Sequence, residues 1–385
     1  MPLRFVPGNR LTLLRNGEEY FPALVTAIDA AKREIFLETY IFADDQTGSL
    51  IADALARAAA RGLAVHVVVD GFGARDFAPR FRAMLQDAGA QVLVFRPKIS
   101  PLTLRRSRLR RMHRKLVVVD AECAFVGGIN IVDDFDASAP SSARYDFALR
   151  IEGPLVNDVR LTAASLWSSL AWLNLRIRSR LPGASPKVCP PRGTQTAALV
   201  VRDNFRHRRD IETAYLELID AARGEVLIAM AYFFPGRQFR RALVGAAERG
   251  VHVVLLVQGL SDHLVMHYAS RALFGSFLDA GIEIHEHAYS ELHAKVAVFD
   301  GANACVGSSN IDPFSLLLAR EANVFVSDGG LASLLRANLL EAIGRARPIP
   351  SQAWKQRSLS VRLRMWVAYG LARLLMSLSR VQGWH

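Results

Sequence analysis

The chain has 385 residues, 51% of them hydrophobic and 22% charged, so its composition excludes a disordered protein. Three cysteines are too few for a small domain held together by disulfides. The formal net charge of +12 predicts an anionic partner, which leaves nucleic acid, an acidic membrane surface and a phosphorylated substrate open. Only six of the 48 basic residues are lysines, so a lysine that recurs in a motif is informative.

The first part of the chain alternates between predicted strands and predicted helices. Apolar runs of strand length lie at 35–42, 64–69, 91–95 and 115–119. Between them lie helical patterns, one of which, at 49–60, is expected to stop at Gly62 because glycine adopts the left-handed conformation that ends a helix. The alternation predicts an α/β fold in which helices cover both faces of a sheet.

The second part of the chain repeats the first. The run 61–70 resembles 249–257, and 34–40 resembles 225–232, so we expect Tyr40 and Tyr232 to end matched strands and to pack in the core. The repeat predicts two β-sheet halves related by a pseudo-twofold axis, with one central cleft between them.

The predicted domains are an N-terminal half (1–180), a linker rich in proline and glycine (181–200), a C-terminal half (201–345) and a basic amphipathic tail (346–385). We identify neither a secretory signal nor an apolar run long enough to span a membrane.

One motif, H-x-K-x4-D-x6-G-[GS]-x-N, occurs in both halves with the same spacing. The first copy consists of His113, Lys115, Asp120, Gly127, Gly128 and Asn130. The second copy consists of His293, Lys295, Asp300, Gly307, Ser308 and Asn310. Two copies with identical spacing in a chain with six lysines indicate one shared catalytic site.

The residue types in this motif suit a phosphodiester. Histidine and lysine two positions apart on a strand point to the same face, so two imidazoles and two ammonium groups would converge in the cleft. We expect the glycine pairs to allow a tight turn near a bound anion, and Asn130 and Asn310 to donate amide hydrogens to it. One histidine can attack phosphorus while the other protonates the leaving oxygen. We expect no metal and no other cofactor, because no acidic cluster accompanies the motif.

The paired motifs resemble those of the phospholipase D superfamily, and over most of the chain the detail is similar to bacterial cardiolipin synthases of the B type. The segments that carry the resemblance are 37–48, 111–120, 125–130, 231–236, 306–315 and 321–324. The resemblance implies a phosphatidyltransferase that forms a phosphohistidine and passes its phosphatidyl group to phosphatidylglycerol. The donor is phosphatidylglycerol or, as an alternative, phosphatidylethanolamine.

The resemblance also implies roles for individual residues. His113 would be the nucleophile and His293 the general acid and then base, although the near symmetry of the two motifs leaves the reverse assignment open. Lys115 and Lys295 would hold the phosphoryl oxygens together with the two asparagines.

Further roles concern residues around the two histidines. A carboxylate downstream of each motif, Asp146 and Glu321, would orient its histidine ring. Asp120 and Asp300 would have a supporting, structural part in the catalytic motif. Gly128 departs from the serine that the second copy has at Ser308, which would remove one phosphate contact.

Phospholipid chemistry requires contact with a membrane. Aromatic and apolar residues mixed with arginines at 166–181 and 359–380 are typical of segments that lie in the interface, while packing on the core is the alternative. About twelve extra residues precede His113, and they bring Arg105, Arg106, Arg108, Arg110 and Arg111, which would recruit anionic headgroups.

We therefore expect a protein attached peripherally to the cytoplasmic face of the cell (inner) membrane, with an anionic membrane surface and no nucleic acid as partner. Two alternatives are open: a phosphodiesterase of the same superfamily that hydrolyses phospholipid or nucleic acid, and a catalytically silent membrane-binding protein.

Overall fold

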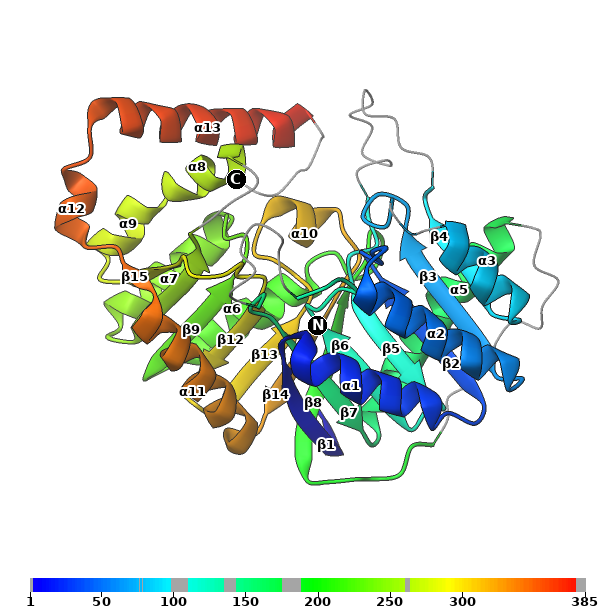
Figure 1. Cartoon of the computed structure of the whole chain (residues 1–385). Helices are drawn as coiled ribbons and strands as arrows, with labels where there is room; N and C mark the ends of the chain where they lie inside the picture. The colour runs from blue at the N-terminus through cyan, green and yellow to red at the C-terminus, as the bar shows by residue number, and fades with distance from the viewer. Residues whose placement is uncertain are drawn as a thin grey trace.

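The computed structural model describes residues 3–75, 77, 79–97, 110–134, 143–174, 188–259 and 264–378. Over these residues the strands form one mixed sheet of 15 strands, with helices packed along it (Figure 1). The predicted α/β class is confirmed.

In the first half the strand order is β1-β7-β6-β5-β2-β3-β4. The strands are β1 (Val6–Arg15), β2 (Glu34–Thr39), β3 (Ala64–Asp70), β4 (Gln91–Phe95), β5 (Lys115–Val119), β6 (Cys123–Gly127) and β7 (Phe147–Glu152). The helices are α1 (Asn16–Asp29), α2 (Gln46–Ala60), α3 (Pro79–Asp87) and α5 (Leu155–Asn174).

The second half repeats this order as β8-β14-β13-β12-β9-β10-β11 and adds β15 at its edge. The strands are β8 (Gln195–Arg202), β9 (Glu225–Met230), β10 (His252–Gln258), β11 (Glu283–His287), β12 (Lys295–Phe299), β13 (Asn303–Gly307), β14 (Glu321–Ser327) and β15 (Arg347–Pro348). The helices are α6 (Asp210–Ala221), α7 (Arg237–Glu248), α8 (Leu264–Arg271), α9 (Phe274–Asp279), α10 (Pro313–Leu317), α11 (Gly329–Arg345), α12 (Ser351–Lys355) and α13 (Leu359–Leu378).

Local sequence explains the repeated β-α-β units. The strands β2, β3 and β4 run parallel and are almost wholly buried, as continuous apolar runs require. Helix α2 begins three residues before the predicted start, because the Asp45 carboxylate accepts a hydrogen bond from Gly48 N and caps it. It ends at the predicted glycine, since Gly62 has a φ of +87°, as does its counterpart Gly250 after α7.

The two halves join through β1 and β8, which pair antiparallel in the middle of the sheet. Two isolated parallel bridges also cross between the halves, Met112 to Arg320 and Tyr145 to Leu292. Each bridge includes the residue immediately before a motif histidine, so the connection between the halves also positions both histidines.

The C-terminal segment lies against the second half. Helix α13 runs along α8 at the top of the molecule, and Met365 and Ala372 on its inner face are buried (Figure 1). Within the described residues, no helix combines the length and the apolar character that crossing a bilayer takes. The domain boundaries stay a prediction: β8 begins inside the segment predicted as linker, and residues 181–187 lie outside the described residues.

Candidate active site

The segments that precede β5 and β12 meet where the two halves join. The backbone N–H of His113 donates to the carbonyl oxygen of Arg320, and that of His293 donates to Tyr145, each over 2.9 Å. The side chains of His113 and His293 are 17% and 15% exposed, so a substrate can reach them. Residues from both halves surround the two histidines and form one site.

Each histidine is bound by a carboxylate from the opposite half. Nδ1 of His113 lies 2.9 Å from Glu321 Oε1, and Nδ1 of His293 lies 2.5 Å from Asp146 Oδ2. The expectation that each carboxylate orients the histidine of its own motif is therefore wrong in its pairing. The cause is the two bridges: Arg320 and Tyr145 pair with the residues before the histidines, which brings the next residues, Glu321 and Asp146, beside the rings.

The contact with a carboxylate fixes the tautomer of each ring. A carboxylate only accepts, so Nδ1 carries the proton and donates it to the carboxylate. Nε2 of each histidine is then the nitrogen available for catalysis. It has a lone pair when the ring is neutral and carries a proton when the ring is charged.

Both motif lysines are buried, and each donates from Nζ to the carbonyl oxygen of its own motif's histidine. Burial lowers the pKa of Lys115 to about 7 and the pKa of Lys295 to about 8, and the charge of Lys295 adds to the effect on Lys115. A negative charge placed near the two ammonium groups would raise both pKa values again.

The remaining titratable groups are shifted in a consistent way. Burial raises the pKa of Asp146 to about 6. Burial also lowers the pKa of His113, and it lowers that of His293 well below the ordinary range, where Lys295 and Arg144 act in the same direction. Groups whose protonation is tuned toward neutrality by burial and neighbours are typical of a catalytic centre.

Gly128 and Ser308 differ because each lies against a different carboxylate, Asp146 in one case and Glu321 in the other. Ser308 Oγ donates to Glu321 Oε2 over 2.5 Å. At Gly128 a Cβ atom would lie 2.3 Å from Asp146 Oδ1, so the shorter carboxylate occupies the space of a side chain there. That oxygen accepts the backbone N–H of Phe147 at 2.8 Å instead.

Gly127 and Gly307 are required for a different reason from the tight turn that we expect from the sequence. Gly127 and Gly307 end β6 and β13 without a positive φ, so no tight turn requires them. A Cβ at Gly127 would lie 2.4 Å from the Cα of Ala148, and one at Gly307 would lie 2.3 Å from the Cγ of Asn323. They allow the close approach of β7 and β14.

The two asparagines hold the ends of the neighbouring strands. Oδ1 of Asn130 accepts the backbone N–H of Ile41 at 3.1 Å, and Oδ1 of Asn310 accepts that of Tyr232 at 3.3 Å. These bonds use the oxygen and not the nitrogen of each side-chain amide, and the donation of that nitrogen to a ligand stays a prediction.

Asp120 and Asp300 lie at the far ends of β5 and β12. The Asp120 carboxylate accepts the N–H groups of Lys32, Arg33 and Glu34, and the Asp300 carboxylate accepts those of Arg223, Gly224 and Glu225. These bonds fix the entry of β2 and β9 into the sheet. The third motif residue therefore supports the strands rather than touching a substrate.

The matching of Tyr40 with Tyr232 is wrong. Ile41 and Tyr232 make the same bond to their asparagines, which places Tyr40 opposite Ala231. The Tyr40 ring packs edge-on against His113 with 4.8 Å between ring centroids, so it borders the site rather than only the core. The offset of 191 between Glu34 and Glu225 already points to Ala231.

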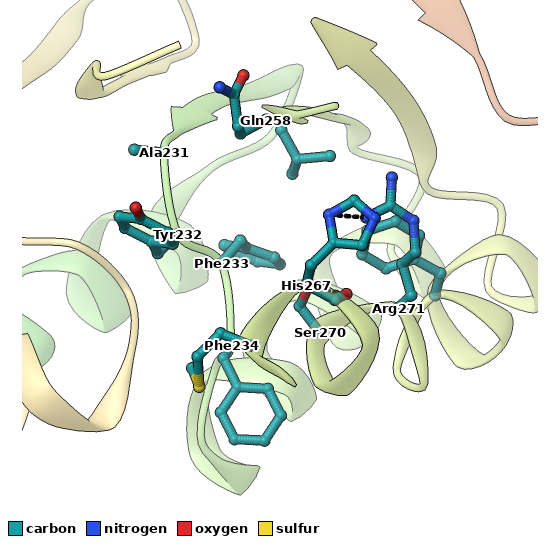
Figure 2. Close-up of a pocket in the computed structure, with 11 residues that line it drawn as sticks. Ala231, Tyr232, Phe233, Phe234, Gln258, His267, Ser270 and Arg271 are labelled. Atoms are coloured by element: carbon teal, nitrogen blue, oxygen red, sulfur yellow. Dashed lines mark hydrogen bonds between the residues drawn. The ribbon is translucent and has the colours of Figure 1, made fainter. Parts of the chain in front are cut away.

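A small pocket in the second half includes Ala231 in its lining (Figure 2). It is lined by Ala231, Tyr232, Phe233, Phe234, Val257, Gln258, Met266, His267, Ser270, Arg271 and Phe274. In Figure 2 the His267 ring and the Arg271 guanidinium face each other, and Nη1 of Arg271 donates to Nδ1 of His267 over 2.6 Å.

The basic insertion is described only at its end. Arg105, Arg106 and Arg108 lie outside the described residues. A nitrogen of Arg111 lies 3.6 Å from the buried Asp70 carboxylate, and the Arg110 guanidinium lies 5.7 Å from the ring centre of Phe205. Arg111 therefore lies beside the end of β3 in the first half, and Arg110 lies against a residue that follows β8 in the second half.

Comparison with known proteins finds a matching family profile and similar proteins over most of the chain. A family profile described as "Cardiolipin synthase, PLD-like domain" matches residues 24–154 and 215–342. Cardiolipin synthase B of Escherichia coli (strain K12) is 39% identical over 343 residues, which cover 86% of this chain and 80% of the relative. The major cardiolipin synthase ClsA of Bacillus subtilis (strain 168) is 29% identical over 373 residues, covering 96% and 76%.

The crystal structure of phosphatidylserine synthase from Haemophilus influenzae Rd KW20 superposes with a TM-score of 0.72. It covers 99% of this chain and 97% of that one at 13% identity, a similarity of fold alone.

Proposed function

The chain belongs to the family of phospholipase D-like cardiolipin synthases, and we propose that it transfers a phosphatidyl group from one phospholipid to phosphatidylglycerol through a phosphohistidine. The observation that carries the proposal is the crossed pair of histidines and carboxylates around two buried lysines. This arrangement supplies a nucleophile, an acid and two cations at one point.

In the first step His113 is the nucleophile. Glu321 holds the Nδ1 proton of His113, so its Nε2 lone pair attacks phosphorus as the bond from phosphorus to the headgroup oxygen breaks. His293 donates its Nε2 proton to that oxygen, and the headgroup alcohol leaves. Lys115, Lys295 and the amides of Asn130 and Asn310 bind the phosphoryl oxygens.

In the second step the acceptor replaces the headgroup. The glycerol hydroxyl of phosphatidylglycerol gives its proton to Nε2 of His293, and its oxygen bonds to phosphorus as the bond from phosphorus to His113 breaks. The products are cardiolipin and the original histidines. In the free protein the pKa of His293 lies far below neutrality, and the negative phosphodiester raises it, so His293 becomes an acid when substrate is bound.

The membrane surface meets the protein at helix α13. Its outer face carries an exposed apolar stripe at helical spacing: Leu359, Leu363, Trp366, Val367, Leu371 and Leu374. Arg362, Arg364 and Arg373 accompany the stripe, and the helix has no acidic residue. This composition suits peripheral attachment to an anionic leaflet, and we assign the cytoplasmic face of the cell membrane as its location.

Hydrolysis of a phosphodiester, in lipid or in nucleic acid, is the second candidate, because water can replace the acceptor at the same centre. The apolar stripe on α13 favours lipid, since a nucleic-acid surface would need basic residues in its place.

The test incubates the pure protein with phosphatidylglycerol vesicles and, separately, with single-stranded DNA. We expect cardiolipin and glycerol from the vesicles and intact DNA. His113→Ala and His293→Ala should each reduce turnover about 10³-fold or more. Rapid quenching with labelled phosphatidylglycerol should place a covalent label on His113. DNA cleavage without lipid turnover, or a fully active single variant, would refute the proposal.

A further inference from the structure

A hollow lies beneath the first turns of helix α13, bordered by α9 and α12 (upper left of Figure 1). Its lining includes no residue of the two histidine motifs. Its volume is about 230 Å³, whereas the pocket of Figure 2 has about 20 Å³. One water molecule needs about 10–15 Å³ of such space, so the hollow has room for a polar lipid headgroup.

We propose that this hollow, lined by Arg271, Trp354, Lys355, Arg362 and Trp366, binds the phosphate headgroup of an anionic phospholipid other than the substrate. The bound lipid ties α13 both to the leaflet and to the helices beneath it. The inference goes beyond the proposed function, because the site is separate from the catalytic centre and takes part in no chemical step. It shares with that proposal only the contact of α13 with the membrane.

The indole N–H of Trp354 is a hydrogen-bond donor at this hollow. Trp354 is only 8% exposed, and its ring packs against Phe274 with 5.4 Å between ring centroids. A Cβ at Gly275, which also lines the hollow, would lie 3.6 Å from Nε1 of Trp354. Among the residues that the structure describes, none accepts this N–H. A phosphate oxygen in the hollow would satisfy the donor and remove the cost of leaving it unpaired.

Positive charge exceeds negative charge next to the hollow. Arg271 and Arg347 both bind the buried carboxylate of Glu286, so two cations share one anion. The Arg357 guanidinium lies 3.7 Å from the ring centre of Trp354. Burial lowers the pKa of Arg357, and the charges of Arg271 and Arg347 add to the effect. An anion bound here would offset the repulsion between these like charges.

Two further cations, Lys355 and Arg362, lie at the exposed edge of the hollow. Nζ of Lys355 lies 2.7 Å from Oδ1 of Asp279, but the two side chains are 65% and 56% exposed, so solvent weakens this ion pair. Arg362 has no ion pair within the described part of the chain. Arginine and lysine side chains bind phosphate oxygens, and these two can turn toward one without breaking a buried contact.

Trp366 connects the hollow with the membrane surface. It is 57% exposed, and it belongs both to the apolar stripe of α13 and to the lining of the hollow. Tryptophan rings lie at the level of the lipid headgroups, and an interfacial helix inserts its apolar face about 5–10 Å into this region. With the stripe inserted, the cations of the hollow lie at the depth of the phosphates, which favours a membrane lipid over a soluble phosphate. The excess of positive charge opposes the ammonium group of a zwitterionic lipid.

The first test measures the binding of single lipid molecules. Dihexanoylphosphatidylglycerol is titrated, below the concentration at which it forms micelles, into His113→Ala, which should not consume it. Tryptophan emission reports the hollow, because Trp354 and Trp366 line it. We expect saturable binding, and binding of dihexanoylphosphatidylcholine that is about tenfold weaker or more. Glycerol 3-phosphate at the same concentration should not compete. Equal binding of the two lipids, or effective competition by glycerol 3-phosphate, would overturn the assignment to an anionic lipid.

The second test reverses one charge of the hollow. Arg362→Glu should weaken the binding of dihexanoylphosphatidylglycerol about tenfold or more. Arg364→Glu is the matched control, because Arg364 is exposed on the same helix but does not line the hollow. An equal loss in both variants would show a diffuse attraction to the helix and contradict a defined site.

The third test fills the hollow. Gly275 lies in α9, and its Cβ would make only an ordinary contact with Trp354, so Gly275→Leu should fold and should weaken binding about tenfold or more. Gly344→Leu on α11, where a side chain would meet open space, should bind normally. Undiminished binding by Gly275→Leu would place the lipid elsewhere.

These results are distinguishable from those that test the proposed function. A wild-type protein that makes cardiolipin but shows no saturable binding at the hollow overturns this inference alone. A protein that binds the lipid through Arg362 but transfers no phosphatidyl group refutes the proposed function alone.

Discussion

The protonation state of Asp146, which binds His293 of the other half, should make the activity depend on pH. Its pKa is raised to about 6, so the carboxylate that holds His293 is lost as the pH falls through that value. The pKa of Lys115 is lowered to about 7, so the ammonium that binds phosphate is lost as the pH rises through about 7. We expect kcat/KM, which reports the free protein, to fall on both sides of this narrow interval.

The variant Asp146→Asn separates the two limbs of this profile. An amide does not titrate, so the acid limb should shift or vanish, at a lower overall rate. The alkaline limb should move to lower pH, because the charge of Asp146 raises the pKa of Lys115 and the amide has no charge. Rates on phosphatidylglycerol vesicles of fixed composition across pH measure this directly. An acid limb that is identical in the variant would assign it to another group.

Gly128 and Asp146 form a matched pair that mirrors Ser308 and Glu321. A Cβ at Gly128 would strike the Asp146 carboxylate, so Gly128→Ser alone should lower activity about 10²-fold by displacing the group that holds His293. Gly128→Ser with Asp146→Glu recreates the arrangement of the second half and should recover much of that loss. A double-mutant cycle on initial rates measures the coupling, and additive effects would contradict it.

The residues of the repeated motif were predictable from the sequence. The pairing of each histidine with its carboxylate was not, because it depends on contact between the two halves. The repeated spacing identifies His113 and His293, because equivalent strands of the two halves, β5 and β12, follow the two histidines. The crossing to Glu321 and Asp146 follows from bridges between backbone segments far apart in sequence, which no local pattern encodes. Ala231 escaped notice because identical tyrosines invite a match one residue out of register.

Among the elements, helix α13 presents one buried and one exposed apolar face. Replacing Leu363 and Val367 by lysine removes apolar area from the exposed stripe without touching the buried Met365 and Ala372. We expect binding to anionic vesicles to weaken about tenfold or more, despite the two added positive charges, because insertion of apolar side chains anchors such a helix.

Sedimentation with vesicles of phosphatidylglycerol and phosphatidylcholine measures this binding. Leu334→Lys with Leu340→Lys on α11, where both leucines are exposed, is the matched control and should leave binding intact. Circular dichroism checks that the variant is folded. Undiminished binding of the α13 variant would show that another surface holds the bilayer.

Some of the strands were predictable from the sequence, and others were not. Buried runs such as β3 and β5 are evident from composition, and the glycine after α2 marks its end. β1 was not predicted, because its buried and exposed positions do not form a clear apolar run. Its importance comes from its place at the centre of the sheet, which is a property of the assembled halves.

On the scale of the molecule, the sheet continues through β1 and β8, so the halves should unfold together. Asn9 is fully buried at this junction: Nδ2 donates to Val6 O at 2.7 Å, and Oδ1 accepts Leu155 N at 2.9 Å. Asn9→Ala leaves the N–H of Leu155 without its acceptor. We expect a loss of about 1–3 kcal/mol in the free energy of unfolding.

Urea denaturation followed by two single-tryptophan reporters tests this cooperativity, with Trp167 in the first half and Trp354 in the second. Both probes should shift to the same lower midpoint in Asn9→Ala, because each half supplies the carboxylate that holds the other's histidine and the strand that completes its sheet. Catalytic activity should be lost over the same range of urea, since neither half contains a complete site. Separate midpoints for the two tryptophans would mean that the halves are stable independently and that the site depends on their docking.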